Sequence, residues 1–158
     1  MNPTARSGLS ARLGVVMLAA LISGSIANLV FPAKIAWVRD WDAFVESQAQ
    51  ASGIGLVTLE ETRRFVSAGT HILFDARPPV DYGAAHIPGA LSLPSEQMEA
   101  EFENFRMILT PDQPILVYCS GKQCDESIQL GDYLIEEGFT NVVLFPGGYN
   151  EWEAGVQP

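Results

Sequence analysis

The stretch ILVYCSGKQCDES, residues 115–127, contains both cysteines of the 158-residue chain. An apolar run that ends in a cysteine and continues through a short polar turn predicts a buried strand, a loop and the start of a helix. In such a loop, backbone N–H groups and the positive end of the helix dipole point toward the group that the loop encloses. Cys119 is therefore predicted to have a thiol pKa below the free value of about 8.5, as a nucleophile requires. Lys122 adds to this effect, whereas Asp125 and Glu126 oppose it.

Other interpretations of the two cysteines stay open. A metal site needs further ligands, and His71 and His86 lie in unrelated contexts, so no metal is expected. Cys124, at the beginning of a helix, is also compatible with simple burial. A structural disulfide across so short a loop would restrain little of the unfolded chain. A reversible disulfide would instead let Cys124 act as a resolving thiol for a modified Cys119.

Charge divides the chain near Asp40. All charged side chains of residues 1–39 are basic, whereas residues 40–158 contain all 19 acidic side chains of the chain. Length and a hydrophobic content of 47% predict a single globular domain with an appendage. The acidic part has no basic stripe that could gather phosphates, so nucleic acid is not an expected partner.

The appendage contains an uncharged apolar run, residues 13–33, behind a basic flank, residues 1–12. The run is long enough for a helix that crosses a bilayer. A cleaved signal peptide is the alternative, because Ser25-Ile26-Ala27 is an acceptable cleavage site. A single-pass anchor is favoured, since the apolar run continues past this site and Trp37 and Trp41 follow at the position of an interfacial belt. The basic residues before the run slightly favour a cytoplasmic amino terminus and a domain on the extracytoplasmic (periplasmic) side.

Residues 34–57 are predicted to be a juxtamembrane linker. Within it, residues 41–50 have apolar side chains at helical spacing, which predicts a short helix lying near the membrane surface. The Gly-containing residues 51–55 predict a hinge.

From residue 58 onward, strand and helix patterns alternate, which predicts a parallel sheet covered by helices on both faces. Thr58 and Glu61 have the spacing of a capping box, and Gly69 ends the helix that they begin. The predicted strands are residues 71–76, 90–93, 114–119 and 141–145, and the predicted helices are residues 58–68, 95–109 and 125–137.

Three separated stretches resemble the rhodanese-like domain family. They are FDARPPVDYGAAHIPGALSLP (74–94), VYCSGKQCDES (117–127) and GFTNVVLFPGGYNEWEAGVQP (138–158). Their order and spacing make the resemblance specific. It implies a three-layer α/β/α domain over residues 58–158.

The resemblance also implies a sulfurtransferase that needs no cofactor. Cys119 would take the outer sulfur of a small donor such as thiosulfate or a polysulfide, hold it as a persulfide and pass it to cyanide, a thiol or a protein acceptor. Backbone N–H groups of the loop residues would cradle the persulfide; these residues are Ser120, Gly121, Lys122, Gln123 and Cys124.

The loop departs from many active members of the family. Cys124 stands where they have an arginine, so an anionic donor would have Lys122 as its main cationic partner. The loop instead resembles a subgroup with the pattern Cys-x4-Cys-x2-Ser, in which Ser127 also matches. Two alternatives stay open: a thiol redox protein that uses Cys119 and Cys124 as a couple, and a catalytically silent docking module.

Other residues are predicted to have structural roles. Asp75 and Arg77 resemble the family's scaffold ion pair, and His86 is expected to fix a turn. Ser127 is expected to serve close helix packing, and Trp152 to anchor the core.

Overall fold

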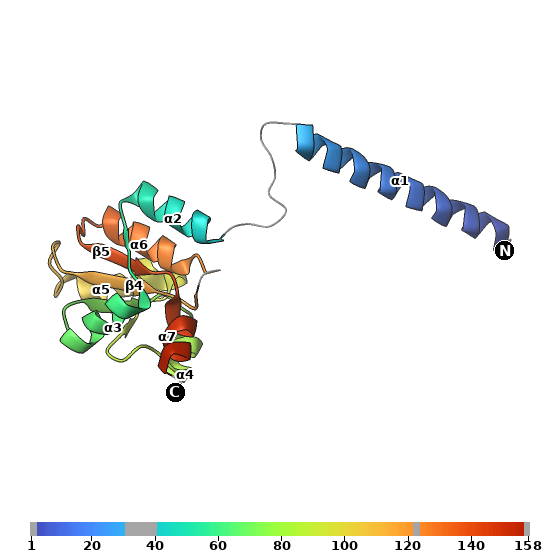
Figure 1. Cartoon of the computed structure of the whole chain (residues 1–158). Coiled ribbons are helices and arrows are strands. Elements are labelled where there is room, and N and C mark those ends of the chain that lie inside the picture. Colours follow the sequence, from blue (N-terminus) through green and yellow to red (C-terminus); the bar gives the residue numbers. More distant parts are fainter. Residues whose placement is uncertain (1–2, 31–40, 122–123, 157–158) are drawn as a thin grey trace. The chain divides into compact units, whose positions relative to one another are not determined.

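A computed structural model describes residues 3–30, 41–121 and 124–156 of the chain. Residues 1–39 and 40–158 form two separate compact units (Figure 1). The elements in chain order are α1 (Pro3–Val30), α2 (Trp41–Ser52), β1 (Gly55–Leu56), α3 (Leu59–Ala68), β2 (Ile72–Asp75), α4 (Pro79–Ala84), β3 (Leu91–Ser92), the 3₁₀ turn η1 (Ser95–Gln97), α5 (Met98–Arg106), β4 (Ile115–Tyr118), α6 (Glu126–Glu136), β5 (Val142–Phe145) and α7 (Gly148–Val156).

The second unit is built on a five-stranded parallel sheet with the order β1-β5-β4-β2-β3. Alternating residues of β4 enter two different cores. Ile115 and Val117 pack with residues of α2, α5 and α6, whereas Leu116 and Tyr118 pack with residues of α3, α4 and α7. Helices therefore cover both faces of the sheet, and the predicted α/β architecture with a central parallel sheet is confirmed.

The first helix of the domain proper begins and ends as its residues dictate. The Thr58 hydroxyl accepts a hydrogen bond from the Glu61 N–H, while the Glu61 carboxylate accepts one from the Thr58 N–H. The Thr58 N–H and the Thr58 hydroxyl both donate to the Glu61 carboxylate, and these two hydrogen bonds lower the pKa of Glu61. Gly69 ends the helix in a left-handed conformation with φ of 61°. The predicted capping box and the predicted stop are thus confirmed.

The segment before residue 58 differs from its expectation as a linker. Residues 41–52 form α2, whose apolar face is buried in the domain core through Val45 and Ala49. Here α2 lies against α6 (Figure 1). Within the predicted hinge, residues 51–55, α2 ends at Ser52, Gly53 lies in a turn with φ of 74°, and the edge strand β1 begins at Gly55. The apolar stripe on residues 41–50 is therefore covered by protein, because it completes one helical layer of the sheet.

The apolar run of the first unit is helical within α1, which contains residues 13–30 of the predicted span. Its remaining residues, 31–33, lie outside the described residues, as does Trp37. Within the described parts of the chain, no helix is both long enough and apolar enough to cross a membrane. The predicted transmembrane helix is thus not confirmed.

We predict that Gly131→Ala lowers the free energy of unfolding by about 1–2 kcal/mol. An added Cβ on α6 would lie 2.8 Å from the Cδ1 of Ile54, in the turn after α2, and this outweighs the better helix propensity of alanine. Ile54→Val removes that Cδ1, so the double variant should be more stable than the sum of the two single changes by about 0.5 kcal/mol or more. Urea unfolding of the four proteins measures this coupling. Strictly additive effects would show that this segment does not pack on α6.

Candidate active site

Cys119 directly follows β4, the central strand of the sheet, and only 2% of its surface is exposed. The carboxyl ends of parallel strands are the edge at which α/β proteins bind ligands. The structure therefore places the predicted nucleophile at the expected edge, under α6 and beside the beginning of α7.

The structure joins Cys119 and Cys124 in a disulfide. Their Cα atoms lie 6.3 Å apart, within the range usual for disulfides. Of the interpretations of the two cysteines, the structure thus shows the bonded pair. The bond encloses the loop residues Lys122 and Gln123, which lie outside the described residues.

Two backbone carbonyl oxygens lie near the Cys119 sulfur among the described residues, while the N–H groups of Lys122 and Gln123 lie outside them, so the predicted cradle stays a prediction. The carbonyl oxygen of Cys124 lies 3.4 Å from Cys119 Sγ, and that of Gly121 lies 3.8 Å from it. The Cys124 N–H donates to the Gly121 carbonyl at 3.0 Å, so it does not point to the sulfur. A disulfide sulfur carries no charge and needs no donors. These oxygens would repel an anionic sulfur, so the conformation shown suits the oxidised pair.

Ser127 contacts the sulfur directly, a role that the sequence interpretation missed. Its hydroxyl donates to Cys119 Sγ at 3.4 Å, and the side chain is 2% exposed. The first turn of α6 places it there, across the loop from the end of β4. The Cys-x4-Cys-x2-Ser spacing was the available signal, but a sequence does not show which way a helix turns its first side chains. A buried hydroxyl aimed at the sulfur can stabilise negative charge on it.

The first residues of α7 donate hydrogen bonds to backbone carbonyls of the cysteine loop. The N–H of Tyr149 donates to the Cys119 carbonyl at 2.8 Å, and the N–H of Asn150 donates to the Ser120 carbonyl at 2.9 Å. Gly148 allows this close approach, with φ of 58° and with no room for a Cβ. A Cβ there would lie 2.6 Å from the Gly121 nitrogen and against the Cys119 carbonyl.

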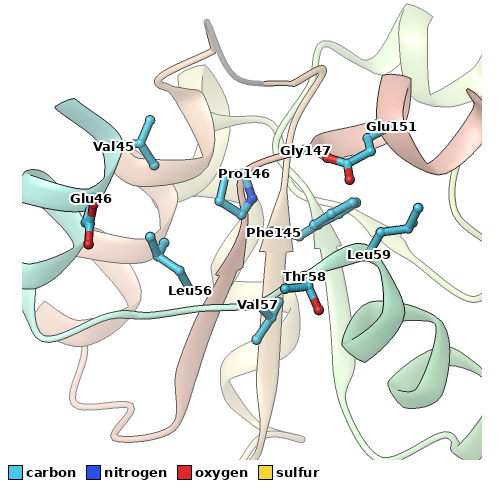
Figure 2. Close-up of a pocket in the computed structure, with 10 residues that line it drawn as sticks. All are labelled: Val45, Glu46, Leu56, Val57, Thr58, Leu59, Phe145, Pro146, Gly147 and Glu151. Atoms are coloured by element: carbon cyan, nitrogen blue, oxygen red, sulfur yellow. The ribbon is translucent and has the colours of Figure 1, made fainter. Parts of the chain in front are cut away.

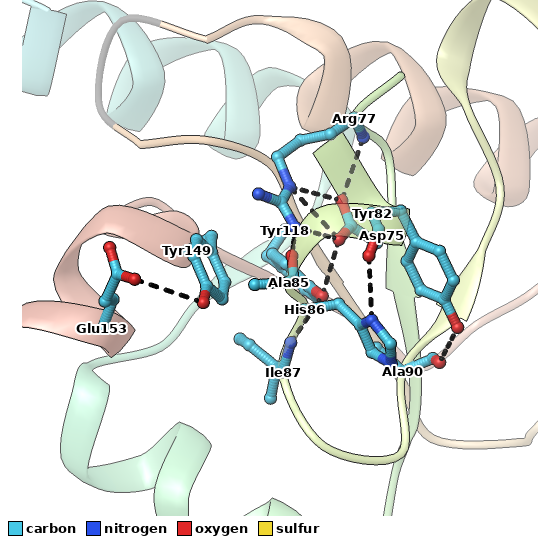
Figure 3. A network of polar contacts seen from close by, with 10 residues as sticks. All are labelled: Asp75, Arg77, Tyr82, Ala85, His86, Ile87, Ala90, Tyr118, Tyr149 and Glu153. Atoms are coloured by element: carbon cyan, nitrogen blue, oxygen red, sulfur yellow. Dashed lines mark hydrogen bonds and ion pairs between the residues drawn. The ribbon is translucent and has the colours of Figure 1, made fainter. Parts of the chain in front are cut away.

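A buried polar network lies behind the loop (Figure 3). Asp75, at the end of β2, accepts hydrogen bonds from Arg77 Nε at 2.9 Å and Nη2 at 2.6 Å. It also accepts one from the Tyr118 hydroxyl at 2.8 Å, and the Ile87 N–H donates to that same hydroxyl at 3.1 Å. Arg77 Nη2 further donates to the Ala85 carbonyl at 2.7 Å. The predicted ion pair of Asp75 and Arg77 is therefore present. Through the hydrogen bond from Tyr118, Asp75 also connects β2 to its neighbour β4.

The surroundings of Tyr118 and Arg77 raise the pKa of both side chains, so Tyr118 stays neutral and Arg77 stays charged. Burial and the nearby Asp75 charge raise the pKa of Tyr118 far above its ordinary value, so its hydroxyl stays a donor. Burial alone would lower the pKa of Arg77, but the hydrogen bonds and charge of Asp75 outweigh it and raise that pKa. The Arg77 guanidinium also lies 4.4 Å from the centre of the Tyr149 ring. Because Tyr149 holds the Cys119 carbonyl, the network is coupled to the loop.

His86 is exposed and contacts Tyr82. Its Nδ1 lies 2.9 Å from the Tyr82 carbonyl oxygen and its ring stacks on the Tyr82 ring, as expected for a residue that fixes a turn. His71 precedes β2 and so lies at the opposite edge of the sheet from Cys119. Trp152 is partly buried against the core formed with α3 and α4, as predicted.

The described residues contain one group of side chains that could jointly bind a metal ion. The ligand atoms of Cys119, Cys124 and Glu126 lie within 4.8 Å of one another. Because the two sulfurs are bonded to each other, this group offers no thiolate ligand in the state shown.

Comparison with known proteins connects this geometry to a family. The rhodanese-like domain matches residues 58–155. The chain belongs to the rhodanese-like domain family.

Two characterised relatives of this rhodanese-like domain are similar over most of their own length. The thiosulfate sulfurtransferase GlpE of Pseudoalteromonas translucida is 31% identical over 62% of this chain and 88% of the relative. A thiosulfate:glutathione sulfurtransferase of Saccharomyces cerevisiae is 29% identical over 71% of this chain and 87% of the relative. The structure of the human single-domain sulfurtransferase TSTD1 superposes with a TM-score of 0.56 at 24% identity, over 65% of this chain and 97% of that one, which supports the fold.

A pocket of about 310 Å³ lies at the same edge of the rhodanese-like domain, beyond the end of β5 (Figure 2). Val45 of α2, Leu56 and Phe145 give it apolar walls, and Glu46 and Glu151 place carboxylates around it. Its Gly147 precedes the glycine that contacts the cysteine loop. The pocket therefore neighbours the loop but does not include either sulfur.

We predict that Gly148→Ala displaces the cysteine loop and destabilises the rhodanese-like domain by about 2 kcal/mol or more, from the left-handed backbone and the clash together. Gly69→Ala is a matched control, because Gly69 has nearly the same φ, 61°, and open space around its Cα. Thermal unfolding should show the larger loss for Gly148→Ala, and alkylation kinetics of the reduced protein should change only in that variant. Equal losses and unchanged alkylation in both would contradict the close packing of α7 on the loop.

Proposed function

We propose that the chain is a sulfurtransferase in which reduced Cys119 takes a sulfane sulfur from a small donor, holds it as a persulfide and passes it to a thiophilic acceptor. The observation that carries the proposal is the burial of Cys119 at the end of the central strand of a rhodanese-like domain, with the Ser127 hydroxyl on its sulfur. The activity named for the two relatives, thiosulfate sulfurtransfer, supports the same reaction class.

The reaction divides into two displacements at one sulfur atom. The Cys119 thiolate attacks the outer sulfur of thiosulfate, sulfite leaves with the bonding electron pair, and an acceptor nucleophile then removes the outer sulfur from Cys119. Ser127 is placed to donate to the anionic sulfur in both steps, and the hydrogen bonds from α7 hold the Cys119 backbone still. Loop N–H groups that face the reduced sulfur would add further donors to it.

The described charges near the loop are unfavourable for a highly anionic donor. Asp125 and Glu126 lie at the start of α6, and Glu126 lines a small pocket together with Glu96. Thiosulfate therefore serves only as a test donor in this proposal, and polysulfide is tested beside it.

A thiol redox couple is the second candidate function. The observation that favours it is the Cys119–Cys124 disulfide itself. Such a couple would exchange electrons with other thiols without ever carrying an added sulfur. An added sulfur on Cys119 therefore separates the two functions.

We predict that the fully reduced chain, freed of reductant and mixed with thiosulfate, releases one equivalent of sulfite in a rapid first phase. Early acid quenching and intact-mass analysis should show one added sulfur, and polysulfide should add it as well. Cys119→Ser should do neither, because the attacking atom is gone. Sulfite and mass together measure the first displacement.

In the same assay, Ser127→Ala should slow the first phase about 10-fold, since the sulfur anion loses a charged hydrogen bond. Ser92→Ala, on the edge strand β3, is the control and should react like the unaltered chain. If the reduced wild-type chain gains sulfur from neither donor, it is not a sulfurtransferase of this kind.

We also propose that residues 13–33 anchor the chain in a membrane, with the rhodanese-like domain on the extracytoplasmic side. The support is the absence of charge from this run together with the helix that contains most of it. Large apolar side chains of α1 are also exposed, among them Val16 and Leu21.

The full chain is accordingly expected to sediment with membranes and to need detergent for its release. Val16→Arg combined with Leu21→Arg should weaken membrane retention, because each central arginine costs about 3 kcal/mol of insertion free energy. Cell fractionation measures both. A mature chain that has lost residues 1–27 would contradict the anchor and identify a signal peptide.

A further inference from the structure

We propose that Cys124 discharges the Cys119 persulfide by attacking its inner sulfur, so that the enzyme releases sulfide and is then reduced by an external dithiol. This inference rests on the proposed sulfurtransferase function and adds a second catalytic residue, a product and a class of co-reactant to it.

The bonded pair is the first observation. Cys124 Sγ is attached to Cys119 Sγ, which would be the inner sulfur of a persulfide, in a structure whose sheet, α6 and α7 are all formed. The loop can therefore deliver one thiol to the other without a change of fold. In the state shown, two described carbonyl oxygens lie beside the Cys119 sulfur, an arrangement that an uncharged disulfide tolerates.

The carboxylate of Glu126 is the second observation. Its Oε2 contacts Cys124 Sγ, whereas the donor on Cys119 Sγ is the Ser127 hydroxyl. The two sulfurs thus have different partners, an acceptor of protons for Cys124 and a donor for Cys119. This is the asymmetry expected when Cys124 is the attacking thiol and Cys119 carries the departing sulfur.

The step balances as follows. Cys124 gives its proton to Glu126, and its sulfur attacks Cys119 Sγ. The Cys119–Cys124 bond forms, the bond from Cys119 to the outer sulfur breaks, and the outer sulfur leaves with the electron pair, taking the proton from Glu126 as hydrosulfide. The Cys124 sulfur is oxidised and the outer sulfur is reduced, while Cys119 Sγ is at the same oxidation level in the persulfide and in the disulfide. An external dithiol then reduces the disulfide, becomes oxidised itself and returns both thiols.

The test begins with the full chain, reduced and freed of reductant, and adds one equivalent of thiosulfate. We expect the wild-type chain to gain a sulfur, then to release one equivalent of sulfide and to end with a mass two hydrogens below that of the reduced chain. Cys124→Ser should take up the sulfur and keep it, with no sulfide released. Dithiothreitol should restore further rounds of sulfide release in the wild type.

Variants of two glutamates on α6 test the proton transfer. Glu126→Gln should slow sulfide release about 10-fold or more while the sulfur adduct accumulates. Glu136→Gln, at the exposed end of the same helix, is the matched control and should release sulfide at the wild-type rate.

The possible failures are distinguishable. A wild-type adduct on Cys119 that lasts as long as that of Cys124→Ser would overturn this inference and leave the sulfurtransferase function standing. An adduct that peptide mapping finds on Cys124 in place of Cys119 would overturn both. The absence of sulfite release and of any adduct in both proteins would overturn the proposed function and this inference with it.

Discussion

The arrangement of the sheet edge at which Cys119 lies depends on the buried carboxylate of Asp75. It is fully buried and accepts hydrogen bonds from Arg77 and from Tyr118, so it connects β2 to β4 at the residue just before Cys119. Arg77 in turn faces the ring of Tyr149, whose N–H holds the Cys119 carbonyl. Removing one partner of such a pair leaves a buried charge uncompensated and typically costs about 3–5 kcal/mol. The reactive loop is thus fixed from behind by polar contacts, while its sulfurs face α6.

The two ends of the cysteine loop differ in how their backbone is held. The backbone of Cys119 and Ser120 is held by α7, whereas the segment toward Cys124 is held by a single hydrogen bond between Cys124 and Gly121 among its described contacts of backbone with backbone. The oxidised conformation turns carbonyls to the sulfur, and a sulfur-carrying conformation requires N–H groups there.

The parts of the molecule governed by local pattern could be predicted from the sequence. The strand that ends at Cys119, the capping box of Thr58 and Glu61, and the pair Asp75 and Arg77 are encoded within a few residues of one another. The burial of α2 could not be predicted in this way. An apolar stripe such as that of Val45 and Ala49 shows that a helix face is covered, but not whether lipid or protein covers it. Ser127 was assigned to packing for a similar reason, since its contact with the sulfur depends on how α6 meets the loop.

The most direct measurement follows the transferred atom itself. Thiosulfate labelled only in its outer sulfur is mixed with the reduced chain, and the label is located over time by peptide mass analysis and in the free sulfide. The account predicts that the label appears first on the peptide with Cys119 and later in sulfide, with the cysteines left bonded. Label that never reaches Cys119, or sulfide that forms without it, would contradict the account.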